Sequence, residues 1–356
     1  MHPQFLALTL AATTLSCAAG LQSTADDLLS AYRAPEAPGG ALMVIQGGSV
    51  VYSGAVGLAD VEAGTRIGAE TNFRLASLTK QFTAMAVLIL AERSAVSLDQ
   101  PITEYFPDFA PVGRQITVRH LLTHTSGLVA YEDVMSETTS VPLLDADVLR
   151  LIKTIDSTYF PPGSAYRYSN SGYALLALIV EHASHTGFAQ FLKREIFDPL
   201  GMAGTVAYER TVSEVEHRAY GYTPDTTRPG RFRRTDQSMT SSVLGDGGIY
   251  SSLNDLWRWD DALRSGRLVS AETFREALTP RATVEEGTLW YGYGWYIETF
   301  NGLPAYSHGG STIGFRNHIV RIPARELTII ALFNRADARP EEMTRKLVEA
   351  WLDTAR

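Results

Sequence analysis

Hydrophobic and polar positions along this chain predict strands near both ends and helices between them. Residues 41–56 form two runs rich in Val and Ile around Gly47 and Gly48, which is typical of a β-hairpin. Residues 77–92 are apolar on almost every side, which indicates a buried helix. Strand-like segments and a last amphipathic helix then return near the C-terminus: 291–299, 304–308, 318–321, 327–333 and the helix 340–352.

The middle of the chain is predicted to be mostly helical. Six segments have helical periodicity: 118–122, 145–155, 172–184, 188–197, 254–263 and 271–278. Strands from both ends around a helical insertion predict an α+β fold, an α/β sandwich in which helices flank an antiparallel sheet built from the two chain ends. We expect a single domain over residues 20–356, with its sheet part at about 25–105 and 285–356 and its helical part at about 106–284.

The N-terminus has the pattern of an export signal. Residues 1–25 contain no Asp, Glu, Lys or Arg, and the apolar run 5–15 is shorter than the roughly 20 residues that span a membrane. Small residues follow at 16–20, which favours a signal peptide over residues 1–19 and a periplasmic or secreted protein. The alternative is a membrane-anchored lipoprotein, cleaved before Cys17 and lipidated on it. No other segment is a transmembrane candidate.

Composition narrows the chemistry. The chain has 356 residues, 45% of them hydrophobic, and a net charge of -8, which is typical of a globular protein and argues against a nucleic-acid partner. Cys17 is the only cysteine and lies in the leader, so neither disulfides nor a cysteine nucleophile are expected in the folded domain. Four of the 31 basic residues are lysines, and Lys80 lies inside an apolar helix.

Ser77 and Lys80 stand one helical turn apart, so their side chains lie on the same face. Burial lowers the pKa of a lysine, and a neutral amine can accept the proton of a serine hydroxyl, whereas arginine stays charged. The N-terminus of the helix also offers free N–H groups to a developing oxyanion. A Ser-x-x-Lys tetrapeptide also arises by chance about once or twice in a chain of this length.

Two further motifs carry polar groups suited to catalysis. Tyr168 and Asn170 precede a predicted helix, where a phenol and a carboxamide can face one cleft, although Asn170 also suits a helix cap. The segment 307–311 (SHGGS) lies on a predicted strand, whose glycines let a ligand pair with the strand edge.

Taken together, the three motifs resemble the serine β-lactamase and penicillin-binding protein superfamily, in its branch of class C β-lactamases and DD-peptidase-like hydrolases. Residues 116–128, 160–173, 198–202 and 247–253 also resemble it, and the likeness covers about residues 25–355. The resemblance implies that Ser77 is the acylated nucleophile and that Lys80 and Tyr168 exchange its proton.

The resemblance also assigns the binding groups. Asn170 would position Lys80 and the substrate carbonyl, and the backbone N–H groups of Ser77 and Ser311 would form the oxyanion hole. The substrate would lie along the strand of His308, Gly309 and Gly310. His308 replaces the lysine of class C enzymes, and a mostly uncharged imidazole is a weaker anchor for the carboxylate of a β-lactam or a D-Ala-D-Ala peptide.

Three functions follow as hypotheses. The first is an exported serine hydrolase that cleaves D-amino-acid peptides or β-lactams through an acyl-enzyme on Ser77. The alternatives are a short-chain carboxylesterase of the same fold and a non-catalytic penicillin-binding sensor domain. No cofactor and no partner other than a small-molecule or peptide substrate is expected, and the sequence does not predict an oligomeric state.

Several other polar residues are expected to have no catalytic role. His120 and His124 are four residues apart, as in some zinc sites, but no third ligand stands near them, so no metal is expected. We interpret His124 as a turn or packing residue. Asp246 and the segment 131–133 are expected to be solvated loop residues.

Overall fold

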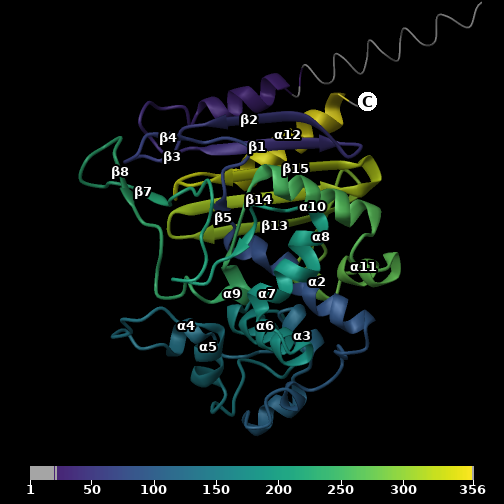
Figure 1. Cartoon of the computed structure of the whole chain (residues 1–356). Helices are drawn as coiled ribbons and strands as arrows, with labels where there is room; N and C mark the ends of the chain where they lie inside the picture. Colours follow the sequence, from purple (N-terminus) through teal and green to yellow (C-terminus); the bar gives the residue numbers. More distant parts are fainter. Residues whose placement is uncertain (1–19, 21, 355–356) are drawn as a thin grey trace, which may run out of the picture.

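An eight-stranded antiparallel sheet lies at the centre of the computed structural model, which describes residue 20 and residues 22–354 (Figure 1). The strands come from both ends of the chain, because β1 pairs with both β2 and β15. In spatial order they are β10 (Ala282–Glu285), β11 (Leu289–Tyr291), β12 (Tyr296–Phe300), β13 (Leu303–Thr312), β14 (Phe315–Ile322), β15 (Leu327–Phe333), β1 (Gly40–Gln46) and β2 (Ser49–Val56).

The predicted β-hairpin is confirmed as β1 and β2. Gly47 and Gly48 join the two strands with φ angles of 58° and 78°, a left-handed conformation that glycine adopts without steric cost. The α+β prediction, with an antiparallel sheet built from both chain ends, is confirmed as well.

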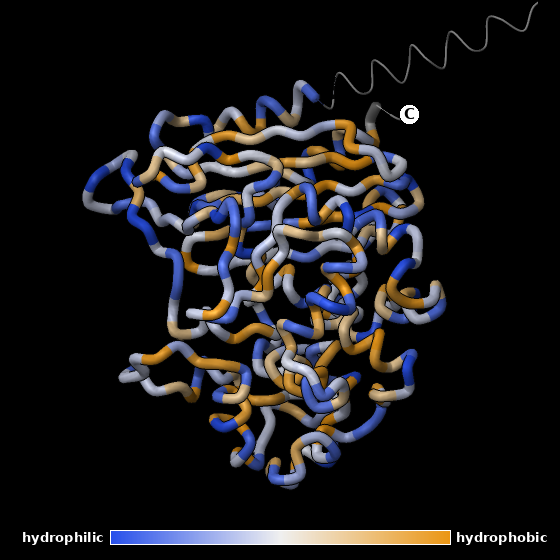
Figure 2. The backbone as a smooth tube through the Cα atoms, viewed as in Figure 1, coloured by the Kyte–Doolittle hydropathy of each residue, from blue (hydrophilic) through white to orange (hydrophobic). Residues whose placement is uncertain are grey.

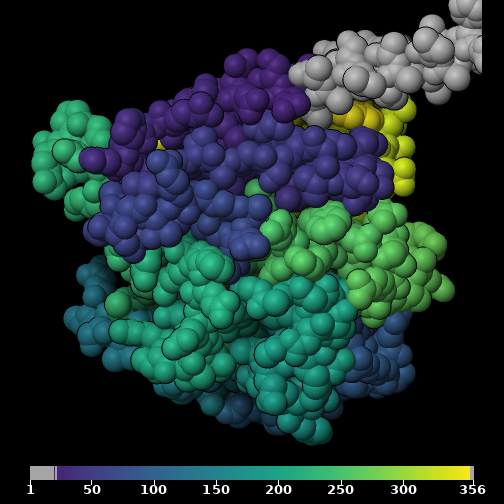
Figure 3. Space-filling model, turned by 45° about the horizontal axis from the view of Figure 1, so that its top comes forward, coloured from purple at the N-terminus to yellow at the C-terminus, as the bar shows by residue number. Residues whose placement is uncertain are grey.

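Both faces of the sheet are covered, and β1 shows how its sequence fits this position. Ala41, Met43 and Ile45 belong to the core on the face of the inserted helices, whereas Leu42 and Val44 face the opposite core. The second face is covered by α12 (Pro340–Thr354) and the N-terminal helical residues 22–30, so the two ends of the chain lie side by side (Figures 1 and 3). A strand buried on both faces reads as a continuous apolar run, as GALMVI does here.

The inserted region surrounds one buried helix, α2 (Thr79–Glu92), which begins directly after the 3-10 turn η1 (Ala76–Leu78). Its main partners are α6 (Asn170–Ser184) and α9 (Leu244–Gly247). The remaining helical elements are η2 (Ile102–Glu104), η3 (Pro111–Gln115), α3 (Val118–Leu122), α4 (Tyr131–Val134), α5 (Asp145–Ile152), α7 (Phe188–Leu192), η4 (Lys193–Phe197), α8 (Asp198–Leu200), α10 (Leu253–Ser265), α11 (Ala271–Ala277) and η5 (Pro323–Arg325).

Small sheets that the sequence did not predict hold the segments around the helices together. One of them pairs β5 (Phe73–Arg74) and β6 (Val206–Ala207) with β9 (Ile249–Ser251), and it fixes the chain just before Ser77. The others are β3 (Leu58–Asp60) with β4 (Thr65–Arg66), and β7 (Tyr222–Pro224) with β8 (Phe232–Arg234). The β7–β8 hairpin projects from the body, and Figure 2 shows that its tip is hydrophilic.

The predicted signal peptide, residues 1–19, and its Cys17 lie outside the described residues. Among residues 20 and 22–354, none of the helices combines the length and apolar character needed to cross a membrane.

Candidate active site

Ser77 lies in the 3-10 turn between β5 and α2, where two neighbouring segments hold the backbone. The N–H of Leu75 donates to Ile249 O at 2.8 Å, and Asn317 Nδ2 on β14 donates to the carbonyl oxygens of Arg74 and Leu75 at 2.9 and 3.2 Å. Ala76 has a φ of 50°, a strained conformation for a residue with a side chain. Strain of this kind, about 1–3 kcal/mol, persists only where the surroundings fix the turn.

Lys80 is completely buried, and its amine contacts three oxygen atoms from three segments of the chain. Its Nζ lies 2.8 Å from Asn170 Oδ1, 2.8 Å from the carbonyl oxygen of Asp246 and 3.3 Å from Ser77 Oγ. Burial lowers the pKa of Lys80 to about 8, although the carboxylates of Asp246 and Glu132 partly oppose this shift. The amine next to the serine hydroxyl therefore changes its charge close to neutral pH.

Tyr168 is the second group near the serine. Its ring centroid lies 4.8 Å from Lys80 Nζ. Burial raises the pKa of Tyr168 well above its usual value, and a hydrogen bond with Ser77 opposes that rise only in part. The phenol is therefore protonated at neutral pH, so Lys80 is the member of this group that titrates there.

Asn170 does not cap the helix that it begins. Ser169 is the N-cap residue, since its Oγ accepts the N–H of Gly172 at 3.1 Å. The carboxamide of Asn170 instead spans the site: Oδ1 accepts from Lys80, and Nδ2 donates to Glu132 Oε1 at 2.8 Å. The capping alternative for Asn170 is therefore wrong.

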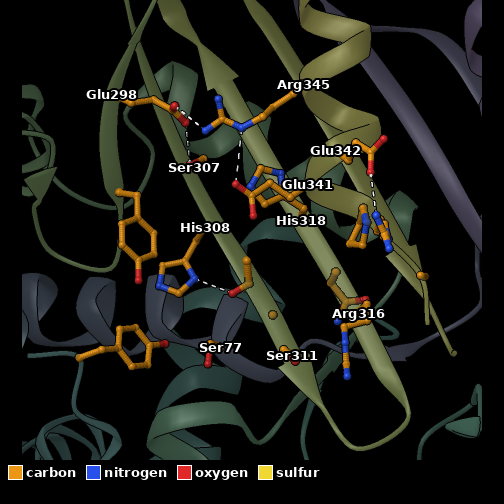
Figure 4. Close-up of a pocket in the computed structure, with 18 of the residues that line it drawn as sticks. Ser77, Glu298, Ser307, His308, Ser311, Arg316, His318, Glu341, Glu342 and Arg345 are labelled. Atoms are coloured by element: carbon orange, nitrogen blue, oxygen red, sulfur yellow. Dashed lines mark hydrogen bonds and ion pairs between the residues drawn. The ribbon is translucent and has the colours of Figure 1, made fainter. Parts of the chain in front are cut away.

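Strand β13 runs directly past the serine, and Gly310 permits the close approach. A Cβ atom at Gly310 would lie 2.0 Å from the carbonyl oxygen of Leu75, which no side chain could tolerate without a backbone shift. Ser77, His308 and Ser311 consequently surround one opening (Figure 4). The structure thus brings together all the residues singled out in the three sequence motifs.

His308 is buried and neutral. Its Nδ1–H donates to Gly309 O at 2.6 Å, and its Nε2 accepts from the hydroxyl of Tyr291 at 3.0 Å. Burial and the nearby charge of Lys80 lower the pKa of His308 to about 3. This position on the strand therefore supplies no positive charge to a substrate.

The expectation that Asp246 is solvated is wrong. Its side chain is buried, and its Oδ2 accepts from the hydroxyl of Tyr131, also buried, at 3.1 Å. Burial raises the pKa of Asp246 to about 6, although the positive charge of Lys80 opposes this rise. Within the segment 131–133, Glu132 and Asp133 are exposed, as expected, but Tyr131 is not.

Asp145 is a supporting residue that sequence reasoning did not identify. Its buried carboxylate accepts the N–H groups of Leu244 and Gly245 at 2.9 and 3.0 Å, and so fixes the turn whose Asp246 carbonyl meets Lys80. An aspartate at the start of a predicted helix gives no sign of such a distant contact.

His124 is a turn and packing residue, as expected. Its φ is 58°, and its buried ring lies 4.3 Å from that of Tyr168 and 5.0 Å from that of Tyr173. Its Nδ1 accepts the N–H of Ser169 at 3.1 Å, which ties the ring to the turn between Tyr168 and Asn170. In the described part of the chain, no group of three or more His, Cys, Asp or Glu side chains is placed to hold a metal ion.

The cleft has a volume of about 970 Å³ and continues beyond the serine. It extends from Ser77 around β13 to the first turns of α12, where Arg345 forms an ion pair at 2.7 Å with Glu298 on β12 (Figure 4). A space of this size accommodates a small molecule or a short peptide.

Comparisons with known proteins agree with this geometry. The β-lactamase family model matches residues 25–350. Penicillin-binding protein 4* of Bacillus subtilis is 31% identical over 310 residues, which cover 84% of this chain and 68% of that protein. The D-aminopeptidase of Brucella anthropi is 30% identical over 302 residues, 83% of this chain, but the match spans only 56% of the length of that relative.

Solved structures give the same result for the fold. The octameric penicillin-binding protein homologue from Pyrococcus abyssi superposes with a TM-score of 0.81 at 26% identity, over 94% of this chain and 77% of that one. The D-amino acid amidase from Ochrobactrum anthropi SV3, complexed with L-phenylalanine amide, has a TM-score of 0.79 at 23% identity, over 96% of this chain and 98% of that one.

Proposed function

Because this chain belongs to the β-lactamase family of serine hydrolases, we propose that it cleaves amides and peptides whose scissile carbonyl follows a free α-amine, with Ser77 as the nucleophile. The D configuration of that first residue is carried over from the D-aminopeptidase relatives. The observation that carries the proposal is the exposed carboxylate of Glu132 beside Asn170 and Ser77.

In the proposed reaction, neutral Lys80 accepts the hydroxyl proton of Ser77 while Oγ bonds to the substrate carbonyl carbon. The N–H groups of Ser77 and Ser311 stabilise the resulting oxyanion. The proton then passes through the phenol of Tyr168 to the leaving nitrogen, and the C–N bond breaks. Water attacks the acyl-enzyme in the second half, with the same groups exchanging its proton, and the acid leaves as Ser77 regains its hydrogen.

The charges around the serine support a substrate that carries an ammonium group. Glu132 forms no ion pair within the described residues, and it lines a small pocket together with Ser77. On the strand side, His308 is neutral and cannot anchor a carboxylate. Arg74 lines the same small pocket as Glu132, but its guanidinium is buried and already bonded. It donates to the carbonyl oxygens of Gly247 and Ser241 and to Gln237 Oε1.

One observation favours a second candidate, hydrolysis of substrates with a free carboxylate, such as D-Ala-D-Ala peptides or β-lactams. Arg316 lines the cleft and pairs with Ser311 across the β13–β14 ladder. Its Nη1 donates to the carbonyl oxygens of Thr312 and Phe315, so part of the guanidinium is already engaged. This bonding makes Arg316 a weaker carboxylate anchor than an unengaged cation.

A panel of substrates tests the proposal: D-Ala-p-nitroanilide, its N-acetyl form, a D-Ala-D-Ala peptide, nitrocefin and p-nitrophenyl butyrate. We expect the free-amine anilide to be the best amide and acetylation to lower kcat/KM by about tenfold or more, since a charged hydrogen bond is lost. Faster turnover of nitrocefin or the D-Ala-D-Ala peptide would favour the second candidate, hydrolysis of substrates with a free carboxylate. Turnover of the ester with none of the amides would favour an esterase, and acylation by a β-lactam without turnover would favour a sensor.

Variants assign the roles. Glu132→Gln should lower kcat/KM for the free-amine anilide and leave the N-acetyl form nearly unchanged. Asp133→Asn, at the adjacent exposed carboxylate, is the matched control and should affect neither. Ser77→Ala and Lys80→Arg should each abolish labelling by a serine-directed phosphonate, and near wild-type labelling of Lys80→Arg would exclude Lys80 as the base.

We also propose that residues 1–19 direct export and that residues 20–356 form the one mature domain, with lipidation of Cys17 as the alternative. The N-terminal sequence of the exported protein distinguishes these forms. A chain that starts at Ala19 or Gly20 supports the signal peptide, whereas a lipid-modified Cys17 at the N-terminus supports the lipoprotein.

A further inference from the structure

A second cavity lies between the sheet and the helices α10 and α11. It has a volume of about 510 Å³ and lies over β13, β14, β15 and η5. It shares no lining residue with the cleft at Ser77. Its size falls within the range of small-molecule sites.

Two buried charged side chains line this cavity. Arg321 on β14 is 5% exposed and Asp260 on α10 is 3% exposed. Arg321 Nε donates to Asp260 Oδ1 at 2.7 Å, and Thr328 Oγ1 donates to the same oxygen at 2.7 Å. The pair therefore uses only one nitrogen of the guanidinium, Nε, and one carboxylate oxygen.

The unused atoms of this pair are open to the cavity. The terminal nitrogens of Arg321 and the Oδ2 of Asp260 have no hydrogen-bond partner within the described residues. These atoms are nevertheless accessible to solvent, since none of them belongs to the described polar atoms that lack both a partner and solvent contact. Because both residues line the cavity, these atoms are available there to a ligand.

The rest of the lining adds an apolar wall, two further arginines and a second carboxylate. Leu263, Phe274, Leu278 and Leu327 supply the apolar surface. Of the two further arginines, Arg264 pairs with Asp261 at 2.6 Å, whereas Arg275 is exposed and forms no ion pair within the described residues. The second carboxylate is that of Glu326. A ligand for this lining has an apolar part and polar groups of both charges.

We propose that this cavity binds a small zwitterion with an apolar side chain, that is, an α-amino acid. Its carboxylate would bind the terminal nitrogens of Arg321, with Arg275 adding to the attraction, and its ammonium would bind Asp260 Oδ2. A simple anion would meet the Asp260 carboxylate, and a simple cation would meet the Arg321 guanidinium. A zwitterion satisfies both, and its side chain fits against Phe274 and Leu278.

This inference does not depend on the proposed function, because it uses none of the residues at Ser77. Under that function, however, the released product belongs to the same chemical class as this ligand. The second cavity would then bind product at a distance from the cleft.

Isothermal titration with D- and L-phenylalanine, 3-phenylpropanoate and phenethylamine tests the inference. We expect at least one enantiomer of phenylalanine to bind, and each half-molecule to bind about tenfold more weakly or worse, since one charged contact is lost. No binding of either enantiomer up to about 10 mM, an affinity of only about -3 kcal/mol, would overturn it. Equal binding of a half-molecule would overturn the zwitterion assignment.

The location is tested by variants that leave the buried ion pair intact, because removal of Arg321 or Asp260 leaves an unpaired charge and can prevent folding. Ala271→Trp fills the cavity, and Arg275→Ala removes the lining arginine that has no ion pair. Ala271→Trp should abolish phenylalanine binding, Arg275→Ala should weaken it several-fold, and neither should change hydrolysis at Ser77. Glu132→Gln is the matched control for binding at the cleft: loss of binding in this variant but not in Ala271→Trp would place phenylalanine beside Ser77 and refute the second site.

Discussion

Replacement of Asp246 by asparagine removes a negative charge beside Lys80 and keeps the shape of the side chain. The amide oxygen can still accept the hydroxyl of Tyr131, and the backbone carbonyl that meets Lys80 Nζ is unchanged. The carboxylate of Asp246 raises the pKa of Lys80 against the effect of burial. Its loss should therefore lower that pKa and leave more of the amine neutral at a given pH.

The expected size of the effect follows from the charges. Two unit charges about 6 Å apart interact by about 3 kcal/mol at an effective dielectric constant of 20, which is about two pKa units. Because Asp246 and Lys80 form no direct ion pair between their charged groups, we take about one unit. With a pKa of about 8, roughly one-tenth of Lys80 is neutral at pH 7, and a fall of one unit makes this about one-half.

The assay is kcat/KM against pH from about 5 to 10 with D-Ala-p-nitroanilide. The acid limb of this profile is the rise of kcat/KM as the base loses its proton. Asp246→Asn should move this limb down by about one pH unit and raise kcat/KM at pH 7 about fivefold, with little change above pH 9. Below about pH 6 the two proteins should converge, because wild-type Asp246 is then protonated as well. Asp225→Asn, on the remote β7–β8 hairpin, should leave the limb in place. An unchanged or upward-shifted limb in Asp246→Asn would refute the role of Lys80 as the titrating base.

Two further substitutions test how the site is held. Gly310→Ala should lower kcat/KM by about 100-fold, because its Cβ would lie 2.0 Å from Leu75 O and force β13 away from the serine turn. Gly309→Ala is the matched control: its Cβ would meet no atom closer than 3.8 Å, so kcat/KM should fall far less. His124→Phe keeps the ring packing but leaves the buried N–H of Ser169 without its acceptor, which costs about 1–3 kcal/mol. We expect kcat to fall by about tenfold with KM and the far-ultraviolet spectrum little changed, and an unchanged kcat would contradict this role for His124.

The parts of the site that the sequence predicted are set by local geometry. Ser77 and Lys80 meet because three residues make about one helical turn, and this holds in any helix that starts near Ser77. The apolar pattern of α2 correctly indicated that Lys80 is buried. The family resemblance, in contrast, predicted that the segments of Tyr168 and His308 lie beside Ser77 and Lys80. No local rule joins positions so far apart in the chain.

The parts that the sequence did not predict depend on long-range contacts between polar groups. Asp246 has the local pattern of a loop carboxylate between glycines, and its burial results from the packing of α9 against α2 and α6. Asp145 likewise serves a turn about a hundred residues away. Hydrophobic periodicity identifies which apolar faces are buried, but it carries no information on which buried polar groups will find partners.

The two carboxylates that raise the pKa of Lys80 differ in exposure. If Lys80 is the base, as proposed, this difference predicts that substrate binding changes its pKa. Asp246 is buried and acts on Lys80 at every stage, whereas Glu132 is exposed and open to a substrate ammonium. Once an ammonium neutralises the charge of Glu132, its upward effect on the pKa of Lys80 is lost, and the amine becomes neutral at a lower pH. The acid limb of kcat, which reports the bound enzyme, should therefore lie below that of kcat/KM for a free-amine substrate. For the N-acetyl substrate, which has no ammonium, the two limbs should coincide, and a gap of equal size for both substrates would refute the coupling through Glu132.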